Sequence, residues 1–197
     1  MKFHIGVLIA VLALGVETPR ATAQTSTIKS RANLSVASSA NMERIPPRQG
    51  LSDRDQKFIE QMAQTHMAEI QFGQLAQHNG GVWSQGYGKD MVREHAMALE
   101  EVKKVAADKG LALSKDVDIA TKKSFNRLNQ YHGAPFDELY RNMMIAGLKQ
   151  VLNLIQDEIR LGYNSDVRGY AITAETAVKL HLSLAQQQAT ILGAKSG

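Results

Sequence analysis

The feature that most constrains this chain is an apolar stripe at helical spacing in residues Lys89–Lys109, with a histidine inside it. The stripe consists of Met91, Val92, Ala98, Leu99, Val102, Val105 and Ala106. His95 falls among these residues, whereas the acidic and basic side chains take the other faces. The spacing predicts an amphipathic helix that turns one imidazole towards the core.

Two further segments place one polar side chain in an apolar stripe. The first stripe is Phe58, Met62, Thr65, Glu69, Phe72 and Ala76, and the second is Val167, Tyr170, Ala171, Ala174, Ala177, Val178, His181, Leu184 and Ala185. Glu69 and His181 therefore share the inward direction predicted for His95. Helical phase gives each side chain a direction and not a distance, so this pattern predicts a polar interior without showing that the three groups meet.

Capping residues indicate where the first helix begins and ends. Ser52 is a suitable N-cap with Asp55 in the capping-box position, which predicts a helix over residues 53–78. We expect Gly80-Gly81 to end this helix through positive φ. Residues 82–88 are expected to be weakly helical, because each of their two glycines lowers helix propensity by about 1 kcal/mol.

The remaining elements follow from periodicity and from Gly and Pro. They are a helix at residues 89–109 before Gly110, a connection at 111–117, a short helix at 118–131, a break at Gly133-Ala134-Pro135, a helix at 136–161 that Gly162 closes, and a last helix from about 164 to 192. Pro135 suits the first turn of its helix. This order predicts an all-α protein: a four-helix bundle with one additional short helix.

The first 23 residues have the pattern of a secretory signal peptide. Lys2 precedes the apolar run Ile5–Val16, and Ala21-Thr22-Ala23 is a small-x-small cleavage pattern. The run has roughly 12 residues, too few to cross a hydrocarbon core of ~30 Å comfortably. We therefore predict cleavage after Ala23 and a periplasmic or secreted protein that begins at Gln24.

The alternative is an uncleaved signal, which would tether the protein to the membrane. Finding Gln24 at the N-terminus of the exported protein would exclude this tether.

Residues 24–50 are rich in Ser, Thr, Ala and Asn and lack a sustained apolar period, so we expect a flexible linker there. The bundle domain is expected at residues 51–194.

Composition and motifs exclude several classes of function. The chain has no cysteine, which excludes disulfides, thiolate metal sites and a cysteine nucleophile. Its net charge of +4 is mild, and no cluster of Lys and Arg is interleaved with aromatic residues, so we expect no nucleic-acid binding. No local motif marks a nucleophile, and we predict that the protein is not an enzyme.

Several stretches, taken in this order and spacing, resemble a known family. They are residues 58–63 (FIEQMA), 67–76 (MAEIQFGQLA), 91–95 (MVREH), 133–140 (GAPFDELY) and His181-Leu182. Together they resemble the exported bacterial ferritin-like family known as domain of unknown function 4142, over about residues 51–192. The resemblance implies a ferritin-like four-helix fold and export, and it implies no established activity.

The resemblance also implies a polar centre that this chain has only in part. The family pattern has a Glu in the first helix, an acidic residue followed by His in the second, another such pair in the third and a His in the fourth. Glu69, Glu94-His95 and His181 stand at three of these places, whereas Gly147-Leu148 occupies the third. Thr176 replaces a proline that the pattern has before the last His.

The candidate site residues are Glu69, His95 and His181. No Glu-x-x-His motif occurs, which argues against a di-iron carboxylate site. Imidazole and carboxylate groups together suit a single divalent ion of zinc, iron or manganese. The interpretation that we favour is a set of core polar residues hydrogen-bonded to one another with no cofactor, since burying them unpaired would cost on the order of 1–3 kcal/mol each.

Neighbouring side chains are interpreted as structural. His66 lies one turn from Glu69 and is either a replacement ligand or a histidine at the rim or surface, and we favour the latter. Arg93-Glu94 is assigned to the helix surface. Methionines at helical spacing are interpreted as core filling rather than soft-metal ligands; they are Met62, Met67, Met91, Met97, Met143 and Met144.

Two hypotheses for function remain. The first is a non-enzymatic, exported helical bundle of the periplasm or envelope that acts through binding, with an envelope protein as a candidate partner, or in a stress-related role. The second is a periplasmic metal-binding ferritin-like protein that uses Glu69, His95 and His181.

Overall fold

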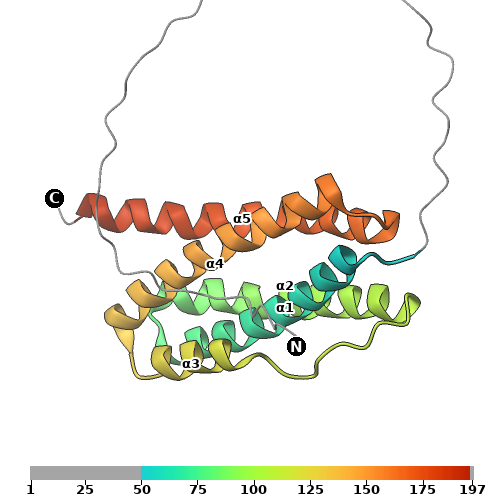
Figure 1. Ribbon diagram of the computed structural model, residues 1–197. Coiled ribbons are helices and arrows are strands. Elements are labelled where there is room, and N and C mark those ends of the chain that lie inside the picture. The colour runs from blue at the N-terminus through green and yellow to red at the C-terminus, as the bar shows by residue number, and fades with distance from the viewer. Residues whose placement is uncertain (1–49, 196–197) are drawn as a thin grey trace, which may run out of the picture. The chain divides into compact units, whose positions relative to one another are not determined.

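The computed structural model describes residues 50–195, which form five helices and no strand (Figure 1). The helices are α1 (Asp53–Asn79), α2 (Val82–Asp108), α3 (Ile119–Leu128), α4 (Gly133–Leu161) and α5 (Ser165–Lys195). The predicted all-α bundle of four long helices and one short helix is confirmed. The predicted signal peptide at residues 1–23 and the linker up to residue 49 lie outside the described residues. Within residues 50–195, no helix is both long and apolar enough to cross a membrane.

The four long helices form two antiparallel hairpins. A two-residue turn joins α1 to α2, and a three-residue turn joins α4 to α5, while the connection that contains α3 leads from one hairpin to the other (Figure 1). The helices of each hairpin pack along one another, and α1 also packs against α4. One long crossover between two hairpins is the connectivity of ferritin-like bundles.

The core of the bundle is apolar and rich in aromatic residues and methionine. Its fully buried large side chains include Phe58, Phe72, Met62, Met91, Leu128, Phe136, Tyr140, Met144, Leu148 and Ile155. Their burial confirms the expectation that most methionines fill the core. Met97 is the exception, because its side chain is 58% exposed on α2.

A carboxylate of each hairpin binds the turn of the other hairpin. Asp137 of α4 accepts a hydrogen bond of 2.9 Å from the backbone N–H of Gly81. The buried Asp55 of α1 accepts hydrogen bonds from the backbone N–H groups of Tyr163 and Asn164, at 2.8 and 3.1 Å. Burial opposes the ionisation of Asp55, but the hydrogen bonds that it accepts hold its pKa below the ordinary value.

The start of α1 agrees with the sequence prediction, and the turn after it does not. The capping box of Ser52 and Asp55 is present. Gly80 has a φ of −88°, so the predicted positive φ is wrong. Glycine is needed there for space, because a Cβ on Gly80 would lie 2.5 Å from the Cβ of Ser84.

The second helix begins earlier than its glycines suggest. α2 starts at Val82, so the prediction that residues 82–88 are only weakly helical is wrong. A tertiary contact outweighs their low propensity: a Cβ on Gly88 would lie 2.6 Å from the carbonyl oxygen of Gly73, and a Cβ on Gly73 would lie 2.7 Å from that of Gly88. The backbones of α1 and α2 therefore touch at this glycine pair.

The later boundaries differ from the predictions by a few residues. Gly110 follows α2 with a φ of +68°, the left-handed conformation that glycine permits. α3 ends at Leu128, three residues before the predicted end. α4 begins at Gly133, which places Pro135 inside its first turn.

The glycine contact predicts opposite effects for the same substitution at different positions of α1 and α2. Gly73→Ala and Gly88→Ala should each destabilise the protein by about 1–3 kcal/mol, because the new methyl group meets backbone atoms that cannot move aside cheaply. Gly86→Ala is the control, since nothing lies within 4 Å of a Cβ at that exposed position. It should stabilise the protein by up to about 1 kcal/mol through helix propensity. Urea denaturation measures all three, and equal effects would contradict the close contact.

Candidate functional site

Three histidines from three helices lie next to one another inside the bundle. His66 of α1, His95 of α2 and His181 of α5 are all buried, with exposures of 3%, 4% and 3%. The Nδ1 atoms of His66 and His95 are 2.9 Å apart. The ring centroids of His95 and His181 are 5.4 Å apart. The structure therefore brings two predicted site residues together, and it adds His66, whose assignment to the rim or surface is wrong.

The hydrogen bond between His66 and His95 requires at least one neutral ring. The Nδ1 of His66 faces the Nδ1 of His95, so one of these two nitrogens is the hydrogen-bond donor and the other is the acceptor. The Nε2 of His66 pairs with the hydroxyl of Tyr170 at 2.6 Å. Burial lowers the pKa of His66 to about 4 and, together with the neighbouring histidines, lowers the pKa of His95 well below its ordinary value. The Nε2 of His95 is buried and has no hydrogen-bond partner.

The three buried histidines, His66, His95 and His181, form a row, and Glu94 connects this histidine row to the surface. Its carboxylate lies 3.1 Å from the Nε2 of His181, while its other oxygen lies 2.8 Å from the guanidinium of Arg93. Burial lowers the pKa of His181, and the charge of Glu94 acts in the opposite direction. With a side chain 33% exposed, Glu94 belongs to the edge of the polar centre. The assignment of Arg93-Glu94 to the helix surface is therefore right for Arg93 and wrong for Glu94.

Glu69 is buried in the core, and among the described contacts it makes no hydrogen bond to the three histidines. Its Oε2 is buried and has no hydrogen-bond partner, and burial raises the pKa of Glu69 to about 8. It borders a cavity of about 20 Å³, together with Thr65, Thr121 and Gly147. A Cβ on Gly147 would have nothing within 4 Å, so the cavity leaves open space beside this glycine.

Two tyrosines are influenced by Glu69, and one of them, Tyr87, also contacts His181. The hydroxyl of Tyr87 donates a hydrogen bond of 3.1 Å to the carbonyl oxygen of His181, and the two rings lie edge to face. The ring of Tyr140 lies 6.1 Å from that of Tyr87, and its hydroxyl is buried without a partner. Burial and then the charge of Glu69 raise the pKa of both tyrosines.

The described residues do not assemble the predicted ligands into a metal centre. Within residues 50–195, no group of three or more His, Asp or Glu side chains could hold a metal ion. His95 and His181 are neighbours, whereas Glu69 has no hydrogen bond to either ring among the described contacts. Two buried ligand-type atoms, Oε2 of Glu69 and Nε2 of His95, remain unpaired.

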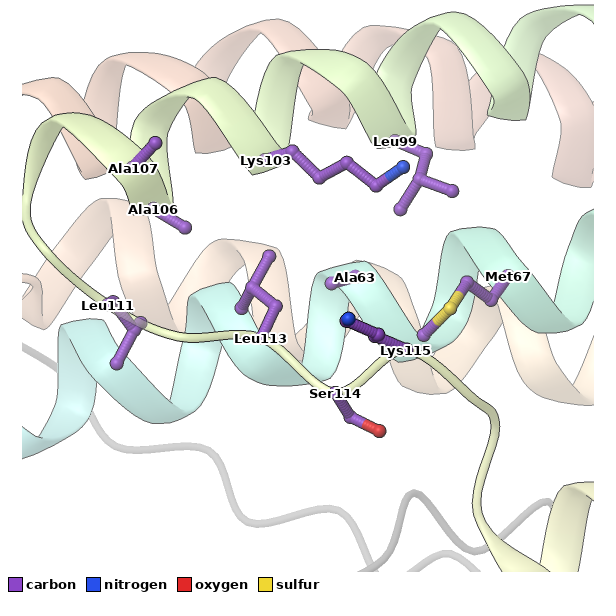
Figure 2. A pocket seen from close by; sticks show the side chains of 10 residues that line it. All are labelled: Ala63, Met67, Leu99, Lys103, Ala106, Ala107, Leu111, Leu113, Ser114 and Lys115. Carbon is purple, nitrogen blue, oxygen red and sulfur yellow. The ribbon is translucent and has the colours of Figure 1, made fainter.

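A groove lies on the side of the bundle, between α1, α2 and the connection that follows α2 (Figure 2). This apolar groove has a volume of about 360 Å³. It is lined by Ala63, Met67, Leu99, Lys103, Ala106, Ala107, Leu111, Leu113, Ser114 and Lys115. Sequence reasoning missed it, because residues 111–117 have no periodicity and only the fold places them against α1.

The connection that borders the groove is attached to the neighbouring helices. The side-chain amide of Gln64 on α1 donates a hydrogen bond of 2.8 Å to the backbone carbonyl of Asp116. The carboxylate of Asp116 pairs with Lys122 of α3. Asp118 caps α3 by accepting a hydrogen bond of 2.7 Å from the backbone N–H of Thr121. The groove is therefore a formed feature of the fold.

Comparison with known proteins gives one match. A family model described as "Domain of unknown function (DUF4142)" matches residues 40–188, which is most of the chain. No match was found among curated proteins or among solved structures.

The buried groups predict a stability maximum near neutral pH. Histidines with lowered pKa values stay neutral in the folded protein, so stability is lost as the pH falls below 6.5, where the unfolded chain takes up protons. Glu69 has a raised pKa, so the folded protein keeps a proton that the unfolded chain releases above pH 4.5. Stability from this group is therefore lost as the pH rises towards about 8.

Glu69→Gln should remove this alkaline loss. Relative to the variant, the wild-type protein should lose about 1.4 kcal/mol of unfolding free energy per pH unit between roughly pH 5.5 and 7.5. Urea denaturation at several pH values measures the difference. Glu60→Gln, at an exposed position of the same helix, is the control. The same slope change in both variants would rule out a buried Glu69 with a raised pKa.

Proposed function

We propose that this chain, which belongs to the family of domain of unknown function 4142, is a non-enzymatic exported protein of the periplasm or envelope that acts by binding an apolar ligand. The observation that supports binding is the apolar groove. Concave, mostly apolar surfaces of roughly 300–1,000 Å³ with a few polar groups are the usual form of ligand sites. The groove has a volume in this range.

The composition of the groove favours binding over catalysis. Its lining has aliphatic, methionine and alanine side chains, two lysines and one serine, and it has no histidine or carboxylate. A general acid or base must come within hydrogen-bond reach of its substrate. The three histidines are instead buried and are not among the residues that line the groove.

Export is supported by the signal-peptide pattern of residues 1–23. Cleavage after Ala23 would release a periplasmic or secreted protein that begins at Gln24. The absence of cysteine from the chain agrees with a protein whose stability outside the cytoplasm depends on its helical core.

Binding of an apolar ligand is tested with a neutral fluorescent probe, N-phenyl-naphthylamine, titrated into the mature protein. One probe molecule should bind per chain, and Met67→Gln should weaken binding by roughly tenfold because it places an amide in the apolar groove. Met97→Gln is the matched control, since Met97 is exposed on α2 and does not line the groove. No binding, or equal losses in the two variants, would overturn the proposal.

A second candidate function is metal binding by Glu69, His95 and His181. It is favoured by the unpaired Oε2 of Glu69 and the unpaired Nε2 of His95, which are ligand types that zinc, iron and manganese accept. The absence of a ready ligand group among the described residues places it second.

Metal content decides this second candidate. Mature protein purified from the exported fraction without chelators is analysed by mass spectrometry, beside His95→Ala and the control His78→Ala at an exposed position of α1. Near-stoichiometric zinc, iron or manganese that is lost only in His95→Ala would establish a metalloprotein. A content far below stoichiometry, equal in the three proteins, would reject it.

A further inference from the structure

The charged side chains that line the apolar groove are all positive. Of its ten lining residues, Lys103 and Lys115 carry charge and none is acidic. Lys103 lies on the α2 side of the groove, and Lys115 lies on the side of the connection (Figure 2). A ligand with one negative group would therefore meet only positive charge along the lining.

The two lysines differ in what they already bind. The ammonium of Lys103 lies 2.7 Å from a carboxylate oxygen of Glu100, one turn away on α2. Lys115 is exposed, and no ion pair to it is present among the described residues. Lys115 is therefore the cation that is available to a ligand, and Lys103 supports it from the opposite wall.

The apolar walls define the rest of the ligand. Met67 of α1, Leu99 of α2, and Leu111 and Leu113 of the connection are each half-buried, so each still exposes apolar surface in the groove. Covering such surface with a hydrocarbon chain is favourable by about 25 cal/mol per Å². Methionine is unbranched and flexible, so Met67 can adapt to the shape of a hydrocarbon chain.

We propose that the groove binds a single-chain fatty acid, with the hydrocarbon chain against Met67, Leu99, Leu111 and Leu113 and the carboxylate beside Lys115. This inference rests on the proposed function, because it names the ligand class of the same groove. The groove is open at the surface, so the carboxylate keeps part of its hydration while it pairs with Lys115. The positive charge of Lys115 matches the carboxylate of a fatty acid, and the apolar walls match its hydrocarbon chain.

The experiment compares three competitors that share one hydrocarbon chain. Decanoate, decanol and decyltrimethylammonium displace N-phenyl-naphthylamine from the mature protein, each below its critical micelle concentration. Decanoate should compete best, by roughly tenfold over decyltrimethylammonium, because the lysines attract one head group and repel the other. Raising the salt concentration should narrow this difference.

Two charge-reversal variants test whether the preference for decanoate depends on Lys115. Lys115→Glu should remove the preference for decanoate, and since Lys115 is exposed the fold should be retained, as circular dichroism can verify. Lys123→Glu makes the same change of charge at an exposed position of α3 that does not line the groove. It should leave the preference within about twofold of the wild type.

The outcomes separate this inference from the proposed function. Equal competition by the three amphiphiles, or an unchanged preference in Lys115→Glu, would overturn the fatty-acid inference. In that case, probe binding that is still lost in Met67→Gln would leave the groove as an apolar binding site. No probe binding at all would overturn both.

Discussion

The contact between the backbones of α1 and α2 at Gly73 and Gly88 is the constraint on which both sites depend. The backbones of the two helices lie closer together at this point than any residue with a Cβ would allow. A few turns along, this spacing places His66 and His95 within hydrogen-bond distance. Helices that cross at an angle separate away from their contact point. The groove lies in that more distant part, where residues 111–115 cover only one side of the gap between α1 and α2.

The buried histidines and Glu69 stay uncharged at neutral pH. Burial keeps the histidines deprotonated and Glu69 protonated, so the bundle avoids the large cost of burying isolated charges. Glu94 sits at the edge of the histidine row, where water and Arg93 reach it. Among the described contacts, His95 pairs with His66 and His181 pairs with Glu94, so these two predicted residues bond to groups outside the predicted set. The unpaired atoms of Glu69 and His95 show that this bonding is incomplete.

The sequence predicted the helices and the inward direction of Glu69, His95 and His181, because periodicity reports which face of a helix is apolar. It did not predict His66 as buried, because His66 lies outside the apolar stripe that runs from Phe58 to Ala76 on α1. A second stripe of Ile59, Ala63, His66 and Gly73 shows that this helix is covered on two sides. Glu94 was assigned to the surface because it lies at the edge of the apolar face of α2, and its contact with His181 of α5 depends on the fold. The groove and the start of α2 depend on contacts between distant segments, for which the sequence carries no local signal.

Each hairpin turn is bound by an aspartate of the other hairpin, and this has a consequence for how the protein opens. Local opening at the Gly80-Gly81 turn would break the bond to Asp137, and opening at the Tyr163-Asn164 turn would take two donors away from the buried Asp55 carboxylate. A buried charge that loses hydrogen-bond donors is destabilised, so partial opening at either turn gains little. The backbone amides of these surface turns should therefore exchange with solvent deuterium as slowly as those of the core. The bundle would unfold as one cooperative unit, and not as two hairpins in succession.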